Sequence, residues 1–151
     1  MNNTQSSDII LRRPNGIPVA FVEVKNRPGL DPSTAIAIRQ SLMEYQILPP
    51  EGYFLLVTQE QAYLWAKEQA ADPDAAPAQR LSMREVLATY FNEAQLERHM
   101  EGSALELVLY GWLSNLAAGG GTRPGSLAGT NVFDSFANAV RDTKIEVGAL
   151  L

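Results

Sequence analysis

The chain has 151 residues, of which 46% are hydrophobic and 19% charged, a composition typical of one soluble globular domain. It contains no cysteine, which excludes disulfides and thiolate zinc sites and favours a cytoplasmic location, and its single histidine, His99, argues against histidine-rich metal sites. The net charge of −5 argues against a uniformly basic nucleic-acid-binding surface, and no apolar run approaches the roughly 20 residues of a membrane span.

Residues 8–13 and 18–25 are predicted to form a β-hairpin around the turn Asn15-Gly16. Asn-Gly between alternating apolar runs favours a two-residue type I′ turn, because both central residues need a positive φ. In the resulting register Pro18 lies opposite Arg13 in a non-hydrogen-bonded pair, where the missing N–H of proline is not needed.

The same register places Asp8 directly opposite Glu23, on one face of the hairpin. Lys25 lies two residues beyond Glu23 and shares that face, because side chains alternate along a strand. The hairpin therefore brings three ionisable groups together, on the condition that no β-bulge shifts the pairing.

Beyond the hairpin, the sequence predicts helices and strands in turn. We expect a helix over 32–46 with Asp31 as its N-cap, strands over 53–58 and 62–65, a linker over 72–77, helices over 82–92 and 103–117, a loop over 118–130 and an amphipathic helix from Val132, with no assignment beyond Arg141. Ser82 and Glu85 have the spacing of a capping box. The run 53–58 is apolar almost throughout, which predicts a strand buried on both faces.

Basic residues are concentrated near the N-terminus. The first 40 positions contain five basic residues and only three acidic ones, and the basic residues are Arg12, Arg13, Lys25, Arg27 and Arg39. Two interpretations stay open: a locally basic face that contacts phosphates, or ordinary surface side chains.

Several of these segments resemble the PD-(D/E)XK nuclease superfamily. Ser7-Asp8-Ile9-Ile10-Leu11 resembles the strand that carries its metal-binding aspartate, and Val22-Glu23-Val24-Lys25 resembles its (D/E)-x-K strand. The helix that contains Gln40 and Tyr45 is similar to the Gln/Tyr helix of some nuclease branches. With the two strands that follow, the resemblance covers roughly residues 5–66.

The resemblance implies a restriction-endonuclease-like α/β fold, with a small mixed β-sheet flanked by helices. We expect a single domain over 1–151, in which residues 1–70 form the nuclease-like core and residues 78–151 a helical C-terminal extension.

The resemblance also implies hydrolysis of phosphodiester bonds with Mg²⁺ or Mn²⁺. Asp8, Glu23 and the carbonyl of Val24 would hold the metal, and Lys25 would act as the catalytic base or stabilise the developing charge. Gln40 is a candidate contact to substrate or water. The expected substrate is nucleic acid, with DNA preferred over RNA as the interpretation. The expected biological setting is defence, repair or mobile-element processing. A homodimer or a partner subunit stays open.

The chain departs from the superfamily in two ways. Gln40 and Tyr45 are five residues apart where the similar nuclease branch has four, which places them well apart around the helix. Many members carry an acid on a helix before the hairpin, and here no acid precedes Asp8. Glu44, one helical turn beyond Gln40, is a candidate replacement. The alternative interpretation is a catalytically inactive nuclease-fold module that serves in protein assembly through helix 103–117 or the tail. The missing acid and the acidic charge favour the module, whereas the set of Asp8, Glu23 and Lys25 favours the enzyme.

Overall fold

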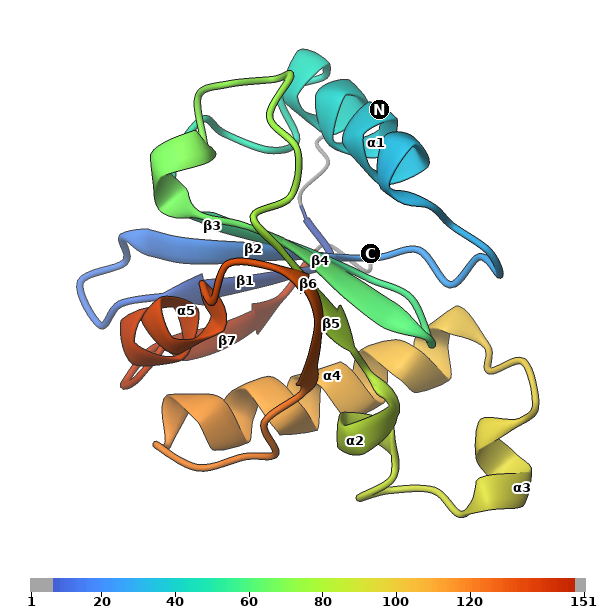
Figure 1. The fold of residues 1–151 in the computed structure, drawn as a ribbon. Helices are drawn as coiled ribbons and strands as arrows, with labels where there is room; N and C mark the ends of the chain where they lie inside the picture. Colours follow the sequence, from blue (N-terminus) through green and yellow to red (C-terminus); the bar gives the residue numbers. More distant parts are fainter. Residues whose placement is uncertain (1–6, 149–151) are drawn as a thin grey trace, which may run out of the picture.

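The structure, a computed structural model, describes residues 7–148 and has a seven-stranded mixed sheet with helices on both faces (Figure 1). The strands are β1 (Ile9–Arg12), β2 (Pro18–Val24), β3 (Tyr53–Val57), β4 (Gln61–Trp65), β5 (Gln79–Ser82), β6 (Gly125–Gly129) and β7 (Lys144–Val147). The helices are α1 (Pro32–Glu44), α2 (Arg84–Leu87), α3 (Glu93–Leu96), α4 (Gly102–Ala117) and α5 (Phe133–Ala139), with a 3₁₀ turn at Lys67–Gln69. The predicted α/β fold class is confirmed. No helix among the described residues is long and apolar enough to cross a membrane.

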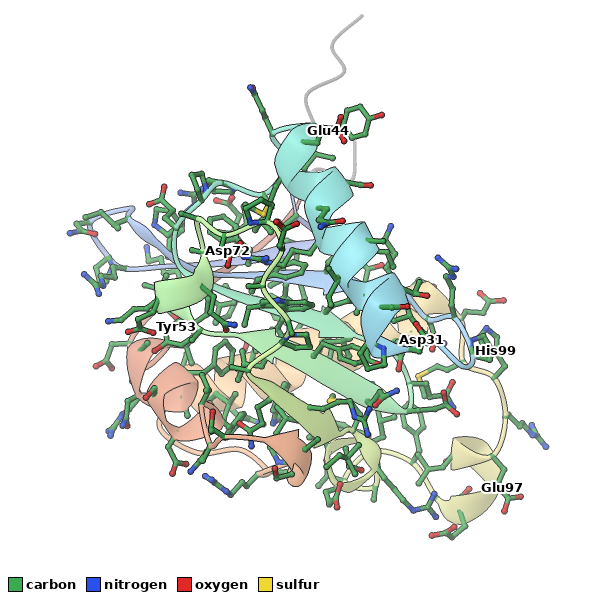
Figure 2. All side chains as sticks on the ribbon, turned by 45° about the horizontal axis from the view of Figure 1, so that its top comes forward. Asp31, Glu44, Tyr53, Asp72, Glu97 and His99 are labelled. Atoms are coloured by element: carbon green, nitrogen blue, oxygen red, sulfur yellow. The ribbon has the colours of Figure 1, made fainter. Side chains whose placement is uncertain are left out.

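The strand order is β6-β5-β4-β3-β2-β1-β7, and only β2 and β3 run parallel. Helix α1 connects these two strands, as a parallel pair requires a crossover. Asp31 caps α1 as predicted, since its Oδ1 accepts the Thr34 N–H at 2.8 Å, and Figure 2 shows Asp31 at the start and Glu44 at the end of this helix.

The core consists of one apolar layer on each face of the sheet. Helix α1 covers Phe21, Phe54 and Leu56 on one face, while α4 and α5 cover the other face through Leu109 and Trp112, among others (Figure 1). Strand β3 is buried at every position, so the predicted two-sided burial is confirmed. Burying one large apolar side chain contributes about 1.5–3 kcal/mol, which makes the α4 contact a main source of stability.

The predicted pairing of the hairpin is confirmed at its centre, where Ile10 lies opposite Phe21, but its turn is different. The Arg13 N–H donates to the Ile17 carbonyl at 2.9 Å, which closes a three-residue loop. Pro18 therefore lies opposite Arg12 and not Arg13, and the prediction for this pair was wrong.

A β-bulge corrects this offset. Leu11 pairs with Ala20 while Arg12 pairs with Pro18, so Val19 is the extra residue in β2. The longer loop moves the register by one residue and the bulge moves it back, because a bulge places two residues opposite one. The pairing next to Asp8 and Glu23 is thereby the one predicted.

The C-terminal part departs from the expected helical extension, because residues 78–148 contribute three strands, β5, β6 and β7, to the sheet. The capping box at Ser82 and Glu85 was wrong as well: β5 ends at Ser82, and the N-cap of the short helix α2 is Met83. The predicted loop 118–130 contains β6, which Gly129 allows by a φ of +92° beside the carbonyl of Ala78. The helices predicted over 103–117 and from Val132 are confirmed as α4 and α5.

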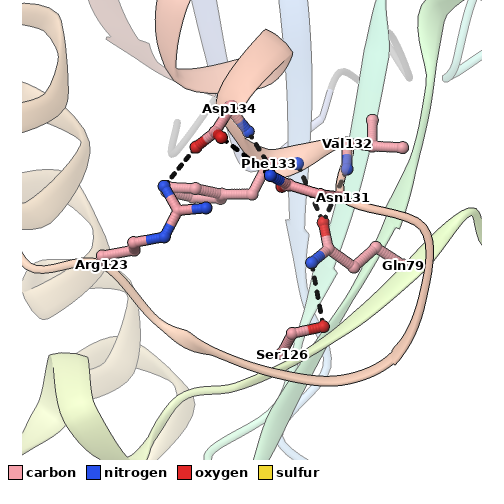
Figure 3. A network of polar contacts seen from close by, with 7 residues as sticks. All are labelled: Gln79, Arg123, Ser126, Asn131, Val132, Phe133 and Asp134. Atoms are coloured by element: carbon pink, nitrogen blue, oxygen red, sulfur yellow. Dashed lines mark hydrogen bonds and ion pairs between the residues drawn. The ribbon is translucent and has the colours of Figure 1, made fainter.

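One buried amide joins the C-terminal elements to each other (Figure 3). Gln79, 3% exposed, accepts the N–H groups of Val132 and Phe133 through Oε1, both at 2.9 Å. Its Nε2 donates to Ser126 Oγ at 3.1 Å. This side chain therefore fixes β5 to β6 and to the start of α5.

Candidate metal centre

Asp8 lies just before β1 and is held between β2 and β7. Its Oδ2 accepts the Val24 N–H at 2.8 Å, and its backbone carbonyl accepts the Gly148 N–H at 2.6 Å. The carboxylate thus takes the place of a strand carbonyl in the pairing with β2. In an extended strand the N–H and C=O of one residue point the same way, so the Val24 carbonyl also faces the side of β2 on which Asp8 lies.

Glu23 is the most unusual polar residue of the sheet. It is 5% exposed, and no described group forms a hydrogen bond with its Oε2. Burial, the negative charge of Asp8 and a side-chain hydrogen bond with Asp8 together raise the pKa of Glu23 to about 8, with a smaller contribution from Glu106, while Lys25 opposes the shift. A buried carboxylate without a partner is costly, and a bound cation would remove that cost.

Lys25 follows Glu23 on the same face of β2, as the alternation of side chains predicts. Its backbone N–H donates to the Val57 carbonyl at 3.0 Å, which fixes this strand end against β3. The structure therefore brings Asp8, Glu23 and Lys25 together at one end of the β1–β2 pair.

Glu106, on α4, is a third acid that the sequence predictions missed. It is half-buried, and burial raises its pKa, with a further contribution from the charge of Asp8. One signal was available: Glu106 is the only charged residue of Gly102–Ala117, whose neighbours Leu105 and Leu109 are core residues. The sequence analysis offered Glu44 as the replacement for the missing upstream acid, whereas the acid that lies near Asp8 is on a helix far later in the chain.

Hydrogen bonds of two amide side chains, Asn26 and Gln59, hold α4 in this position. Asn26 Oδ1 accepts the Gln59 N–H at 2.9 Å, Asn26 Nδ2 donates to the Met100 carbonyl, and Gln59 Oε1 accepts the Met100 N–H at 2.7 Å. Since α4 begins at Gly102, the two amides fix the segment directly before this helix against the ends of β2 and β3. Through this contact the residues that follow β2 and β3 position the helix that carries Glu106.

The structure gives the other candidate side chains contacts or positions of their own. Gln40 Nε2 donates to Asp74 Oδ1 at 3.1 Å, and a contact of Gln40 with substrate or water stays a prediction. Glu44 is exposed at the end of α1 and nothing places it in the site (Figure 2).

Arg39 is not a surface residue but 1% exposed. Its guanidinium donates to the carbonyls of Gln69 and Asp72, both at 2.8 Å, and lies 5.3 Å from the ring centroid of Trp65. Arg12 is also occupied, by an ion pair with Glu146 at 3.4 Å. The proposed basic face is thereby reduced to Arg13, Lys25 and Arg27.

The donor set fits a magnesium-like ion held largely by water. Within residues 7–148, no three His, Cys, Asp or Glu side chains converge into a ready cage for a metal. Mg²⁺ does not need one, because it usually keeps several waters and takes one or two carboxylates. Asp8 and Glu23, whose Oε2 has no hydrogen-bond partner, are the two candidates, and Glu106 adds negative charge nearby.

Comparisons with protein-family models, with curated proteins and with solved structures found no match for this chain.

Proposed function

We propose that this chain is a divalent-metal-dependent nuclease of the PD-(D/E)XK type. The observation that carries the proposal is the buried Glu23 carboxyl group, with an unpartnered oxygen, beside Asp8 and Lys25 on paired strands. Groups with perturbed pKa values and no structural partner are typical of functional sites. The position of Glu106 further supports the enzyme, because it supplies the acid that the N-terminal sequence lacks.

In this proposal Asp8 and Glu23 hold Mg²⁺ or Mn²⁺, with the Val24 carbonyl as a further ligand. The ion supplies an activated water and positive charge against the phosphate. Lys25 orients the water or stabilises the charge that develops on the phosphate. Glu23, whose pKa lies near 8, gives up its proton when the ion binds.

We propose nucleic acid as the substrate, with DNA favoured over RNA, and the cytoplasm as the location. A cleft of about 500 Å³ opens beside Asn26, the residue after Lys25. Arg84, Arg98 and His99 line it, together with the carboxylates Glu60 and Glu97. We propose that the strand next to the scissile phosphate approaches along this cleft, with DNA repair, defence or mobile-element processing as the setting.

The test is cleavage of plasmid, single-stranded DNA and RNA with Mg²⁺ or Mn²⁺. We expect Asp8→Asn and Lys25→Ala each to lose about 100-fold or more of the cleavage rate, as loss of a charge-stabilising group usually does. Glu44→Gln is the control for Glu106→Gln, because both remove one helical carboxylate, and only the second should slow cleavage.

Thermal unfolding provides the second readout. A metal that binds the folded state must raise the melting temperature by linkage, and Asp8→Asn should remove that shift. No cleavage and no metal-dependent shift would favour the inactive nuclease-fold module. Cleavage that survives both substitutions would place the activity elsewhere.

A further inference from the structure

Strand β7 forms one edge of the sheet, and no described residue pairs with its outer side. The Gly148 N–H donates to the Asp8 carbonyl, so this is a hydrogen-bonded pair of the β1–β7 ladder. Such pairs alternate in antiparallel strands. Lys144 and Glu146 therefore bond inward to β1, while the N–H and C=O of Ile145 point outward from the sheet.

We propose that this edge pairs with β7 of a second copy of the chain, antiparallel, with Ile145 opposite Ile145 on a two-fold axis. The two isoleucines then exchange both of their backbone hydrogen bonds. Lys144 lies opposite Glu146 of the second copy in a non-hydrogen-bonded pair, where Cα atoms are only about 4.5 Å apart. Opposite charges in that position stabilise a strand pair, and the symmetry produces the contact twice.

An apolar groove along the same edge completes the surface. The groove, of about 380 Å³, is lined by Ile9, Leu107, Tyr110 and Val147, among others. Leu107 is a residue of α4 and is 74% exposed, which leaves a large apolar side chain on the surface of this helix. The side chains of Lys144 and Glu146 lie on the face of the sheet opposite α4, whereas the groove lies on the face that α4 covers. A second copy would therefore cover both faces of this edge.

The other edge of the sheet lacks these features. Strand β6 begins and ends with the glycines Gly125 and Gly129, and its pairing with β5 is interrupted by a register shift. Glycines and bulges both weaken further strand pairing. The sheet therefore has one edge suited to a second copy and one edge that is not.

Glu106 lines the same groove as Leu107. Two copies joined at β7 would thus place two metal centres on either side of a two-fold axis, an arrangement that suits the two strands of a duplex. This consequence rests on the proposed function, whereas the pairing of the edges does not.

The experiment is sedimentation of the full chain at rising concentration, without metal or nucleic acid. We expect a reversible dimer, weakened about tenfold or more by Lys144→Glu, which sets like charges against each other. The double variant Lys144→Glu/Glu146→Lys should restore it. Arg12→Gln controls for the internal ion pair of Glu146 and should leave the dimer intact.

A second pair of variants tests the groove. Leu107→Glu should also dissociate the dimer, while Leu127→Glu, at an exposed position of β6, should not. A monomer at every concentration overturns the proposal. So does a dimer that withstands both Lys144→Glu and Leu107→Glu, or one that Leu127→Glu dissociates. None of these outcomes depends on cleavage, so the nuclease proposal and the dimer proposal can fail separately.

Discussion

Gln79 and Glu23 are both polar side chains of strand residues, both buried in the same sheet, and they differ in what surrounds them. The oxygen of Gln79 accepts two backbone N–H groups and its nitrogen donates to a hydroxyl. Glu23 has an oxygen without a described partner and two further carboxyl groups nearby. A polar group that serves the fold is satisfied by the fold. An unsatisfied carboxyl oxygen beside other carboxyl groups is the feature on which our proposal of a bound metal rests, and Gln79 is the satisfied reference for it.

The largest effect is expected from Gln79→Leu. Leucine fills the space but leaves the N–H groups of Val132 and Phe133 without an acceptor, at about 1–3 kcal/mol each. We expect the free energy of unfolding to fall by about 3 kcal/mol or more, measured by urea denaturation. Ser126→Ala removes only one partner of Gln79 and should cost less than about 1.5 kcal/mol. If the Gln79→Leu variant were as stable as the wild type, the hydrogen bonds of Gln79 would not stabilise the fold, and Gln79 could not serve as the structural counterpart of Glu23.

Substitution of Glu23 should have the opposite effect on the free energy of unfolding at high pH, because it removes the cost of ionising a buried carboxyl group. Its folded-state pKa, about 8, lies above the ordinary value of 4.5, so the folded state binds its proton more tightly than the unfolded state does. The associated stability is complete below pH 4.5 and is lost as the pH rises through 8. Without metal, we expect a loss of roughly 2–4 kcal/mol between pH 5 and pH 9.

Glu23→Gln should flatten this pH dependence, since glutamine does not titrate. The measurement is the unfolding midpoint in denaturant across that pH range, for the wild type and the variant side by side. An equal slope in both proteins would mean that another group titrates, and the unusual state of Glu23 would be disproved.

The smallest effect is expected from Glu106→Gln. The charge of Glu106 is a minor cause of the shift at Glu23, after burial and Asp8. Its removal should lower the midpoint of the Glu23 transition by less than one pH unit, or less than about 1.4 kcal/mol. Glu44→Gln, at the exposed end of α1, should leave the midpoint unchanged. A shift in the control and none in Glu106→Gln would exclude Glu106 from the site.

Local sequence patterns were sufficient for the hairpin, α1 and the buried strand β3. Each depends on neighbouring residues, such as the cap at Asp31 or the uninterrupted apolar run of β3. They were sufficient for Asp8 and Glu23 only because two errors compensate: the turn is one residue longer than predicted and the bulge at Val19 adds one residue to β2.

The structural features that depend on contacts between residues distant in sequence could not be predicted. Gln79-Arg80-Leu81-Ser82 is polar and short, and it becomes a strand because Leu81 is buried against a helix layer and β6 pairs with it. Glu106 comes near Asp8 only through the packing of α4, and the hydrogen-bond partner of Gln40 is Asp74. None of these partners is close in sequence.

The pairing of β1 with β7 has a consequence for the order of events in folding. It joins Ile9 to Val147, the largest sequence separation of any strand pair in the sheet. Contacts of such separation form late, because the loop-closure entropy must be overcome first. Helix α4, which carries Glu106, comes before β7 in the chain, and the carbonyl of Asp8 is engaged only when Gly148 arrives. We therefore expect the hairpin to bring Asp8 and Glu23 together early, whereas the Asp8 carbonyl is engaged and Glu106 is added only when the C-terminal part of the chain has packed.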